Sequence, residues 1–288
     1  MWLVAINPAS GHGQGAIFAE RVINFLTAQA ISYQVFSGSS ADELQRDLET
    51  FLDTRECEGI ISVGGDGLAH LVLQVAVSRR IPFAVIPAGT GNDIVRSLGF
   101  SLTDIEGYLR KVIKDKPSEI DLGNVDSEWF AAILSTGFDS VVNERANSLR
   151  WPRGPQRYNV SIALELPSFT AIDYQITTDT ESFTTKAMLI AIGNGRSYGG
   201  GMLVCPQANM HDGLFDVMIL EPVSKLEFIK VFPKVYSGSH ITHPAVRTLR
   251  TKRISLSADA IAYADGERIG PAPISAECVP SAGLTWTL

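Results

Sequence analysis

The chain has 288 residues and a mass of 31.2 kDa, and 45% of its residues are hydrophobic against 19% that are charged. This composition is close to the globular average and excludes disorder and fibrous repeats, while the length allows one large domain or two moderate ones. The 24 basic and 31 acidic residues give a formal charge of −7. Such a charge argues against nucleic acid as a partner and limits any contact with anionic lipid to local clusters of positive residues.

The cysteines and the apolar segments both argue for a soluble protein. Cys57, Cys205 and Cys278 are odd in number, far apart and without a CxxC pair, which argues against a disulfide scaffold and a thiolate metal cluster. The first residues lack the basic region of a signal peptide, and no uncharged apolar run reaches the roughly 18–20 residues that span a bilayer. We therefore expect a soluble, cytoplasmic protein.

Strand-like and helix-like segments alternate in the first part of the chain. Short apolar runs predict strands at 2–6, 33–36, 59–63 and 83–86. Apolar residues at helical spacing predict helices over 18–29, 44–52 and 68–77. This alternation indicates βαβ units and a parallel sheet, which binds ligands at the carboxyl ends of its strands.

The pattern changes beyond about Pro117. Predicted strands, separated by Gly, Asn and Asp turns, lie at 118–122, 129–134, 174–178, 186–192, 215–220, 254–257, 274–278 and 284–288. Helical stretches near 141–149 and 223–236 interrupt them. The predicted fold class is α/β, with an N-terminal parallel-sheet α/β domain over 1–122 and a mostly antiparallel, β-rich, sandwich-like domain over 123–275.

Glycine-rich loops follow three of the predicted strands of the first domain. Residues 7–15 lie between the first strand and the first helix, with neither P-loop nor dinucleotide-binding spacing. Gly64-Gly65-Asp66-Gly67 follows the strand at 59–63, and residues 87–93 repeat the design after the next strand. Each loop suits a phosphate, because glycine lets the backbone approach closely and a helix N-terminus follows. Each is also compatible with an ordinary βα turn or helix cap.

Further glycine motifs lie in the second domain. Gly193-Asn194-Gly195 and Gly199-Gly200-Gly201 are followed by Asp212-Gly213 and by Asp265-Gly266-Glu267. Taken singly, each Asp-Gly pair predicts a tight type I′ hairpin turn.

Together these motifs resemble those of the diacylglycerol kinase catalytic-domain family, which holds bacterial lipid kinases, diacylglycerol kinases and sphingosine kinases. NPxSGxxxG, GGDG, PxGTGND, the GGG…P…A…DG stretch and a late DGE occur in the family's order between Asn7 and Glu267. The resemblance implies a nucleotide-binding α/β domain followed by a β-rich lipid-site domain, in a fold related to NAD kinases. In that family the last strands return to the first domain, so residues 276–288 are expected to join residues 1–122.

The resemblance also implies two cofactors, ATP and Mg²⁺. The ATP site is expected at Asn7, Ser10, Gly11, Ser37, Gly64, Gly65, Asp66, Gly67, Gly89, Thr90 and Asn92. Asp66, Asp93 and Asp121 are expected to form the acidic network that places magnesium. Glu267 is expected to be the general base that takes the proton from the lipid hydroxyl, with Asp265 beside it.

The resemblance implies a structural magnesium as well. At two places, however, this sequence departs from the family pattern. Soluble bacterial members bind this ion through a loop that matches Asn209, Asp212 and the Leu214 carbonyl, although a serine is usual at the first position. After GGDG this chain has Leu68, Ala69, His70 and Leu71, where most bacterial members have Thr-Leu-Asn-Glu. A leucine directly after GDG resembles the sphingosine-kinase branch, and the acid expected at 71 is missing.

These features predict an ATP-dependent lipid kinase that phosphorylates the hydroxyl of a diacylglycerol-like membrane lipid. The alternatives are a sphingoid-base kinase, a non-catalytic nucleotide or lipid sensor on the same scaffold, and a soluble-substrate kinase of the NAD-kinase type. The sequence leaves a homodimer open.

A lipid substrate requires a transient, peripheral contact with the membrane surface. Two groups of positive residues are candidates for it: Arg145, Arg150, Arg153 and Arg157 around Trp151, Pro152 and Tyr158, and Arg247, Arg250, Lys252 and Arg253. Each group is either a docking patch for anionic lipid or an ordinary solvated face.

Overall fold

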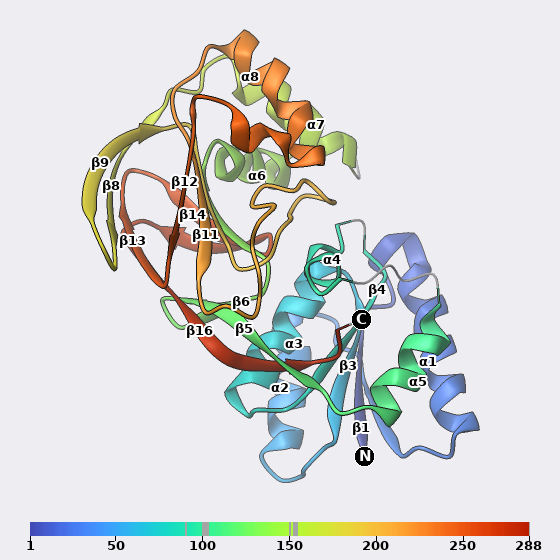
Figure 1. Ribbon diagram of the computed structural model, residues 1–288. Helices are drawn as coiled ribbons and strands as arrows, with labels where there is room; N and C mark the ends of the chain where they lie inside the picture. The colour runs from blue at the N-terminus through green and yellow to red at the C-terminus, as the bar shows by residue number, and fades with distance from the viewer. Residues whose placement is uncertain (90, 100–103, 150, 152–154, 288) are drawn as a thin grey trace. The chain divides into compact units, whose positions relative to one another are not determined.

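The computed structural model describes residues 1–89, 91–99, 104–149, 151 and 155–287 (Figure 1). The chain forms two compact units. Unit 1 comprises Met1–Leu122 and Pro280–Leu288, and unit 2 comprises Gly123–Val279. Five residues of the sequence-based predictions, Thr90, Arg150, Pro152, Arg153 and Leu288, lie outside the described residues.

Unit 1 is built on a parallel sheet. Its strands lie in the order β2 (Tyr33–Phe36), β1 (Trp2–Ile6), β3 (Gly59–Gly64) and β4 (Phe83–Pro87), and all neighbours are parallel. The end of β16 (Ile274–Thr285) adds to β4, with Thr285 opposite Phe83. Strands β1 and β3 are buried along their whole length, as expected for a parallel sheet covered on both faces.

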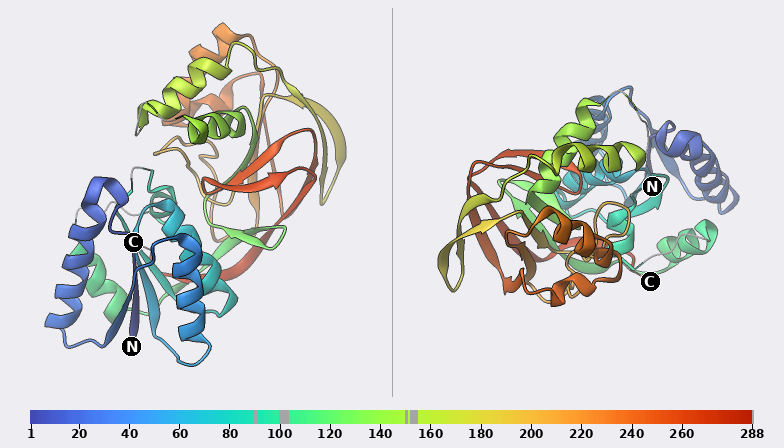
Figure 2. Two further views of the ribbon diagram at one scale, coloured as in Figure 1. Left: turned by 180° about the vertical axis from the view of Figure 1, so that it is seen from behind. Right: turned by 90° about the horizontal axis from the view of Figure 1, so that it is seen from above.

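Helices cover both faces of this sheet (Figures 1 and 2). The helices of unit 1 are η1 (Ser10–Gly13), α1 (Gln14–Ala28), α2 (Ala41–Leu52), α3 (Asp66–Ser78), α4 (Asp93–Ser97) and α5 (Ile105–Lys114). Helix α1 packs against α5, and α2 packs against α3. Helix α3 is buried along most of its length, which explains why its sequence is apolar almost throughout.

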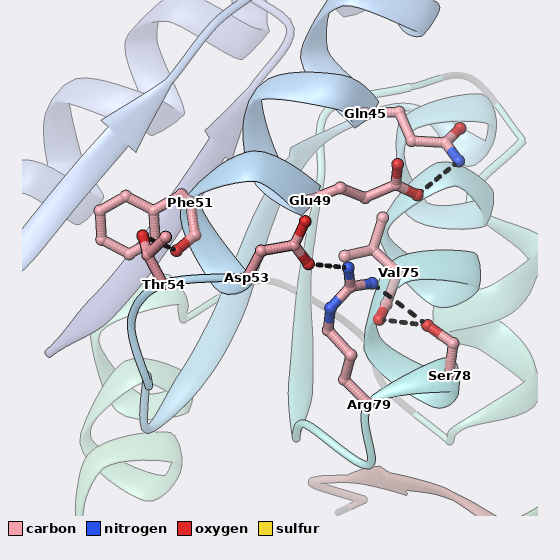
Figure 3. Close-up of polar contacts among 8 residues, drawn as sticks. All are labelled: Gln45, Glu49, Phe51, Asp53, Thr54, Val75, Ser78 and Arg79. Atoms are coloured by element: carbon pink, nitrogen blue, oxygen red, sulfur yellow. Dashed lines mark hydrogen bonds and ion pairs between the residues drawn. The ribbon is translucent and has the colours of Figure 1, made fainter.

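Polar contacts join the carboxyl ends of α2 and α3 (Figure 3). Arg79 donates to Asp53 at 2.9 Å and to the Ser78 hydroxyl at 3.4 Å. The Asp53 side chain is 68% exposed, so water screens the pair. We therefore attribute the α2–α3 packing to buried apolar side chains such as Leu48 and not to this ion pair.

Unit 2 is an antiparallel sandwich. One sheet has the order β12 (Val246–Thr251), β11 (Phe215–Leu220), β10 (Leu189–Gly193), β7 (Ile133–Gly137), β14 (Ile261–Ala264) and β15 (Glu267–Pro271). The other has β16, β13 (Arg253–Ser257), β8 (Ile172–Thr178) and β9 (Ser182–Ala187), and β5 (Ser118–Val125) pairs with β16 and with β6 (Glu128–Phe130). Ile190 and Val217 from the first sheet share a core with Tyr174 and Leu256 from the second.

Helices cover the outer face of the first sheet of unit 2. They are α6 (Phe138–Ser148), α7 (Pro155–Glu165), α8 (Lys225–Val231), η2 (Phe232–Ser237) and η3 (Ser239–Thr242). A second apolar cluster fills the space between them and the sheet, with Phe138 in edge-to-face contact with Phe169 and Phe228. None of the helices in the described ranges has the length and apolar character needed to cross a membrane.

The predicted α/β fold class is confirmed, and several element boundaries were wrong. The predicted strand 129–134 is two strands, β6 and β7, and the predicted strand 186–192 spans the break between β9 and β10. The strand predicted at 274–278 is the start of β16, and of the strand predicted at 284–288 only the first two residues belong to the end of the same β16. Helices α5 and α7 and strand β12 are among the elements that were not predicted.

The α2–α3 packing gives a stability prediction. Leu48→Ala empties a fully buried site on α2 and should lower the free energy of unfolding by about 2–5 kcal/mol. Asp53→Ala, as the control, removes only the exposed ion pair and should cost about 0–1 kcal/mol. Urea titration with hydrogen exchange of the β3 amides measures both. An equal effect of the two variants would contradict this account.

Candidate active site

The first glycine-rich loop of unit 1 is held by its own polar side chains. The Asn7 side chain accepts a hydrogen bond from the Ala9 amide at 3.1 Å, and the Ser10 hydroxyl donates to the Asn7 carbonyl at 2.9 Å. Gly11 has φ of +57°, and a Cβ on it would lie 2.0 Å from the Ala88 carbonyl oxygen. Glycine is therefore required where this loop passes the loop that follows β4.

The Asp66 carboxylate connects the second and third loops. Its Oδ2 accepts the Asn92 amide at 2.7 Å, and its Oδ1 accepts the Asp93 amide at 2.9 Å. A Cβ on Gly89 would lie 2.8 Å from the Gly65 Cα, so the two backbones meet where neither residue has a side chain. The loop after β4 is thus held against the N-terminus of α3.

The three loops follow β1, β3 and β4, which are neighbours in the parallel sheet. In the second loop, the carbonyl of Gly64 accepts a hydrogen bond from the Ala88 amide at 2.7 Å. Gly67, at the other end of this loop, lies in the first turn of α3. Amide groups and the positive end of α3 therefore lie at one edge of unit 1, an arrangement that suits phosphate groups. Ser37 is exposed at the carboxyl end of β2.

Two carboxylates of unit 1 suit a magnesium ion bound together with a nucleotide. A Cβ on Gly91 would lie 2.5 Å from Asp66 Oδ2 and 3.2 Å from Asp93 Oδ2, so both carboxylates flank this residue. No three His, Cys, Asp or Glu side chains in the described part of the chain gather into a metal-binding group. Mg²⁺ commonly uses one or two carboxylates, and phosphate oxygens and water complete its shell. Asp66 and Asp93 fit that mode.

Asp121 has a visible structural function. It is buried in β5, and its Oδ1 accepts the Ser281 amide at 2.9 Å, which fastens the segment of β16 that returns to unit 1. Its expected part in the magnesium network stays a prediction.

The residues after Asp66 that depart from the family pattern belong to the core. Leu68 and Leu71 are both buried in α3, and the Leu68 side chain packs against Gly64. An acid at 71 would therefore occupy an apolar setting in this chain.

In unit 2 the Asp265 carboxylate holds a turn of the backbone. It accepts the amides of Ala131 at 2.7 Å, Ala132 at 2.8 Å and Ile133 at 3.2 Å. Asn194 holds the same segment, because its side-chain amide donates to the Ala131 carbonyl at 2.8 Å. Asp265 is therefore a positioning residue for the segment between β6 and β7.

Glu267 is presented by a tight turn. Asp265 and Gly266 have φ of +51° and +88°, as a type I′ hairpin requires, and Glu267 follows as the exposed first residue of β15. Glu267 and Asp265 belong to unit 2, whereas Asp66 belongs to unit 1. The predicted convergence of Asp66 and Glu267 on one cleft stays a prediction.

The expected structural magnesium loop contains an ion pair. Asp212 Oδ1 accepts the Leu214 amide at 3.2 Å, and its Oδ2 accepts a hydrogen bond from Arg250. The same guanidinium lies 3.3 Å from Asp216. Asn209 is exposed. Arg250 thus supplies the positive charge that a cation would supply, and these residues fit a metal poorly.

Unit 2 contains an apolar cavity with one acid, which the sequence did not indicate. The cavity is lined by Asp139 and by apolar side chains from α6, α7, α8, η2 and the sheet, among them Phe138, Tyr158, Met218 and Phe228. Its free volume is about 50 Å³, against about 10–15 Å³ for one water molecule on the same measure. A long acyl chain would have to move the surrounding helices apart to enter.

Asp139 is 3% exposed, and its carboxylate is bordered by the Ser135 hydroxyl and by the hydroxyl and amide of Ser140, none of which reaches full hydrogen-bond geometry. Burial raises its pKa from the ordinary 3.8 to about 6, and the nearby Ser135 and Ser140 only partly oppose this rise. A buried carboxylate with such weak hydrogen bonding is unfavourable for folding, which makes Asp139 a candidate functional group. The sequence signal was Gly137-Phe138-Asp139 after a strand, but an acid in the first turn of a helix is common without function.

Two family models match most of the chain. Residues 1–125 match the family model described as the diacylglycerol kinase catalytic domain. Residues 132–285 match the model of the YegS C-terminal NAD kinase beta sandwich-like domain.

Several proteins similar to this chain are named diacylglycerol kinases. The chain is 34% identical over 283 residues to a diacylglycerol kinase of Mycobacterium tuberculosis, covering 96% of this chain and 91% of that protein. It is 30% identical over 206 residues to a diacylglycerol kinase of Bacillus subtilis, covering 70% and 68%. A crystal structure of a diacylglycerol kinase from Bacillus anthracis str. Sterne superposes with a TM-score of 0.74 at 17% identity, covering 100% of this chain and 96% of that one. That last likeness concerns the fold alone.

The raised pKa of Asp139 predicts a pH-dependent penalty. In the folded chain the Asp139 carboxyl keeps its proton up to about pH 6, and in the unfolded chain only up to about pH 3.8. The free energy of unfolding therefore falls as the pH rises between these two values. Asp139→Asn should therefore be more stable than the wild type at pH 7, by about 1–3 kcal/mol, and equally stable near pH 4. Urea unfolding of both proteins between pH 4 and pH 7.5 measures the difference. A variant less stable than the wild type at pH 7 would refute it.

Arg250 gives a prediction about metal binding. Arg250→Ala leaves Asp212 and Asp216 without their shared cation, so a divalent ion can then bind between them. The melting temperature of this variant should rise with Mg²⁺ and fall with EDTA more than that of the wild type. Arg247→Ala, whose partner is Glu181, is the control and should respond as the wild type does. A wild-type response as large as that of Arg250→Ala would show that the loop binds metal with Arg250 in place.

Proposed function

The chain belongs to the diacylglycerol kinase catalytic-domain family, and from this premise we propose that it transfers the γ-phosphate of ATP to the hydroxyl of a diacylglycerol-like membrane lipid. In this proposal unit 1 binds the nucleotide and unit 2 binds the lipid. The transfer requires the two reacting oxygens to be aligned, the phosphate charge to be neutralised and a proton acceptor to be present.

The nucleotide part is supported by the loops at the carboxyl edge of the parallel sheet. Gly11, Gly65 and Gly89 keep these loops close together, and the Asp66 carboxylate fixes the third loop against α3. Backbone amides are then ordered before the nucleotide arrives, so that phosphate binding costs little ordering of the loops. Asp66 and Asp93 would hold the magnesium ion, which supplies charge neutralisation to the phosphates.

The observation that carries the lipid part is the cavity of unit 2. Its walls are apolar except for a few side chains, and Asp139 lies among them without a described hydrogen-bond partner. Acyl chains suit the apolar walls, and a polar group of a lipid that enters the cavity can contact the Asp139 carboxylate.

The proton acceptor in this proposal is Glu267. It is exposed at the start of β15 and follows the turn that Asp265 fixes through three backbone amides. Its position is thereby set by buried hydrogen bonds, as a general base needs. Asp265 acts through this turn and contributes no proton transfer.

A sphingoid base is the second candidate substrate, and Asp139 is the observation that favours it. This carboxylate lies among apolar side chains, where its ionised form lacks a cationic partner among the described lining residues. The ammonium group of a sphingoid base would neutralise it, whereas diacylglycerol offers only hydroxyl and ester groups.

Glu267→Gln tests the catalytic assignment. It removes the proton acceptor with little change of shape, so turnover should fall by about 10²–10⁴-fold while the melting temperature is kept. Labelled ATP is incubated with diacylglycerol, sphingosine, phosphatidylglycerol or NAD, and labelled products are separated by chromatography. Asp173→Asn, an exposed change on β8, is the control and should match the wild type.

The four acceptors separate the candidates. Label in diacylglycerol supports the first candidate, and label in sphingosine alone supports the second. ATP binding without label in any lipid would leave a sensor, and label in NAD would indicate a soluble-substrate kinase. Full activity of Glu267→Gln would remove Glu267 from the mechanism.

A further inference from the structure

Helix α7 is apolar on two opposite faces. Tyr158 and Ile162 line the cavity of unit 2, whereas Val160 and Leu164, each two positions further along the helix, are exposed. Trp151, in the segment before α7, is 80% exposed. A helix of a water-soluble protein normally exposes a polar face, so the outer side of α7 suits an apolar environment.

Helix α8 and the turn after it repeat this arrangement. Phe228 and Val231 line the cavity, while Leu226 and Ile229, spaced as neighbours on the other side of α8, are 73% and 57% exposed. Tyr236 in η2 is exposed as well. The inner side chains of α7 and α8 thus enclose the cavity, and the outer ones extend its apolar character to the surface.

Contacts place the end of α7 beside the start of α8. The Lys225 ammonium, at the first residue of α8, donates to the carbonyl of Phe169, which follows α7. Phe138 lies between Phe169 and Phe228, at ring distances of 5.2 and 5.1 Å. Figures 1 and 2 show α6, α7 and α8 gathered at the same end of unit 2. Helices α7 and α8, which carry most of the exposed apolar side chains, therefore lie at the same end of unit 2.

This region is basic in a chain that is acidic. Residues 223–237, which include α8 and η2, contain three lysines and one glutamate, whereas the whole chain has a formal charge of −7. Lys230 and Lys234 are exposed next to the apolar side chains of α8 and η2. Exposed apolar groups with a positive border complement an anionic lipid surface.

The second basic group predicted from the sequence has neither unpaired positive charge nor large exposed apolar side chains. Its four members are paired with acids, Arg247 with Glu181, Arg250 with Asp212 and Asp216, and Lys252 and Arg253 with Glu277. These pairs lower the local positive charge. None of the large exposed hydrophobic side chains identified in the described residues lies in this group.

We propose that a docking face, made of Trp151, Val160, Leu164, Leu226, Ile229 and Tyr236 with Lys230 and Lys234 at its border, inserts into the surface of an anionic bilayer. The proposal rests on the proposed lipid-kinase function, since it places the cavity next to the membrane that holds the substrate. Insertion of the outer side chains of α7 and α8 also gives these helices an apolar setting in which they can separate and admit an acyl chain.

Vesicle sedimentation of the full chain tests the docking face. The double variant Leu226→Ser/Ile229→Ser should bind vesicles of phosphatidylcholine and phosphatidylglycerol at least about ten-fold more weakly than the wild type. Ile17→Ser is the matched control, because Ile17 is 58% exposed on α1 of unit 1, and it should bind as the wild type does. Lys230→Glu/Lys234→Glu should weaken binding to these vesicles and leave binding to pure phosphatidylcholine unchanged.

Two further measurements keep the outcomes distinct. The Leu226/Ile229 variant should lose activity on vesicle lipid but keep it on a short-chain, monodisperse diacylglycerol. If the wild type phosphorylates no lipid and yet binds vesicles through this face, the kinase proposal fails and the docking face stands. Unchanged vesicle binding of both double variants overturns the docking face, as does a wild-type dimer that the Leu226/Ile229 variant converts to monomers.

Discussion

The candidate nucleotide site depends on one carboxylate, that of Asp66, which accepts the amides of Asn92 and Asp93. A charged acceptor makes stronger hydrogen bonds than a neutral one, and here it sits at the N-terminus of α3, where a negative charge is favoured. These bonds form only because Gly65 and Gly89 allow the two backbones to meet. The contact between the two loops therefore needs both the glycines, which let the backbones approach, and the Asp66 carboxylate, which binds the amides.

Unit 2 uses the same device for a different purpose. The Asp265 carboxylate accepts three backbone amides of the segment between β6 and β7, and the Gly266 turn then presents Glu267. In both Asp-Gly motifs the aspartate therefore orders backbone. In the proposed mechanism Asp66 would in addition hold the magnesium ion, whereas Asp265 would leave the proton transfer to Glu267.

The parallel sheet and its loops could be predicted because their causes are local. A strand such as β3 is buried on both faces and reads as an unbroken apolar run, and the glycines follow it directly. The break between β6 and β7 could not, because it is fixed by the Asp265 side chain more than a hundred positions further along the chain. Asp139 escaped for a similar reason: in the sequence it is an ordinary acid at a helix start, and only its burial sets it apart.

The cavity and the helices around it oppose stability in two ways. Asp139 is a buried carboxylate without a described partner, and the outer sides of α7 and α8 expose apolar side chains to water. Both features are unfavourable in isolation, and both become favourable in contact with a lipid: its hydroxyl or ammonium group satisfies the acid, and its bilayer covers the helices. A fold that keeps two unrelated penalties around one cavity is best explained by a single ligand that relieves both. Their coincidence in unit 2, where the inner and outer faces of the same two helices are involved, therefore supports a lipid more strongly than either feature does alone.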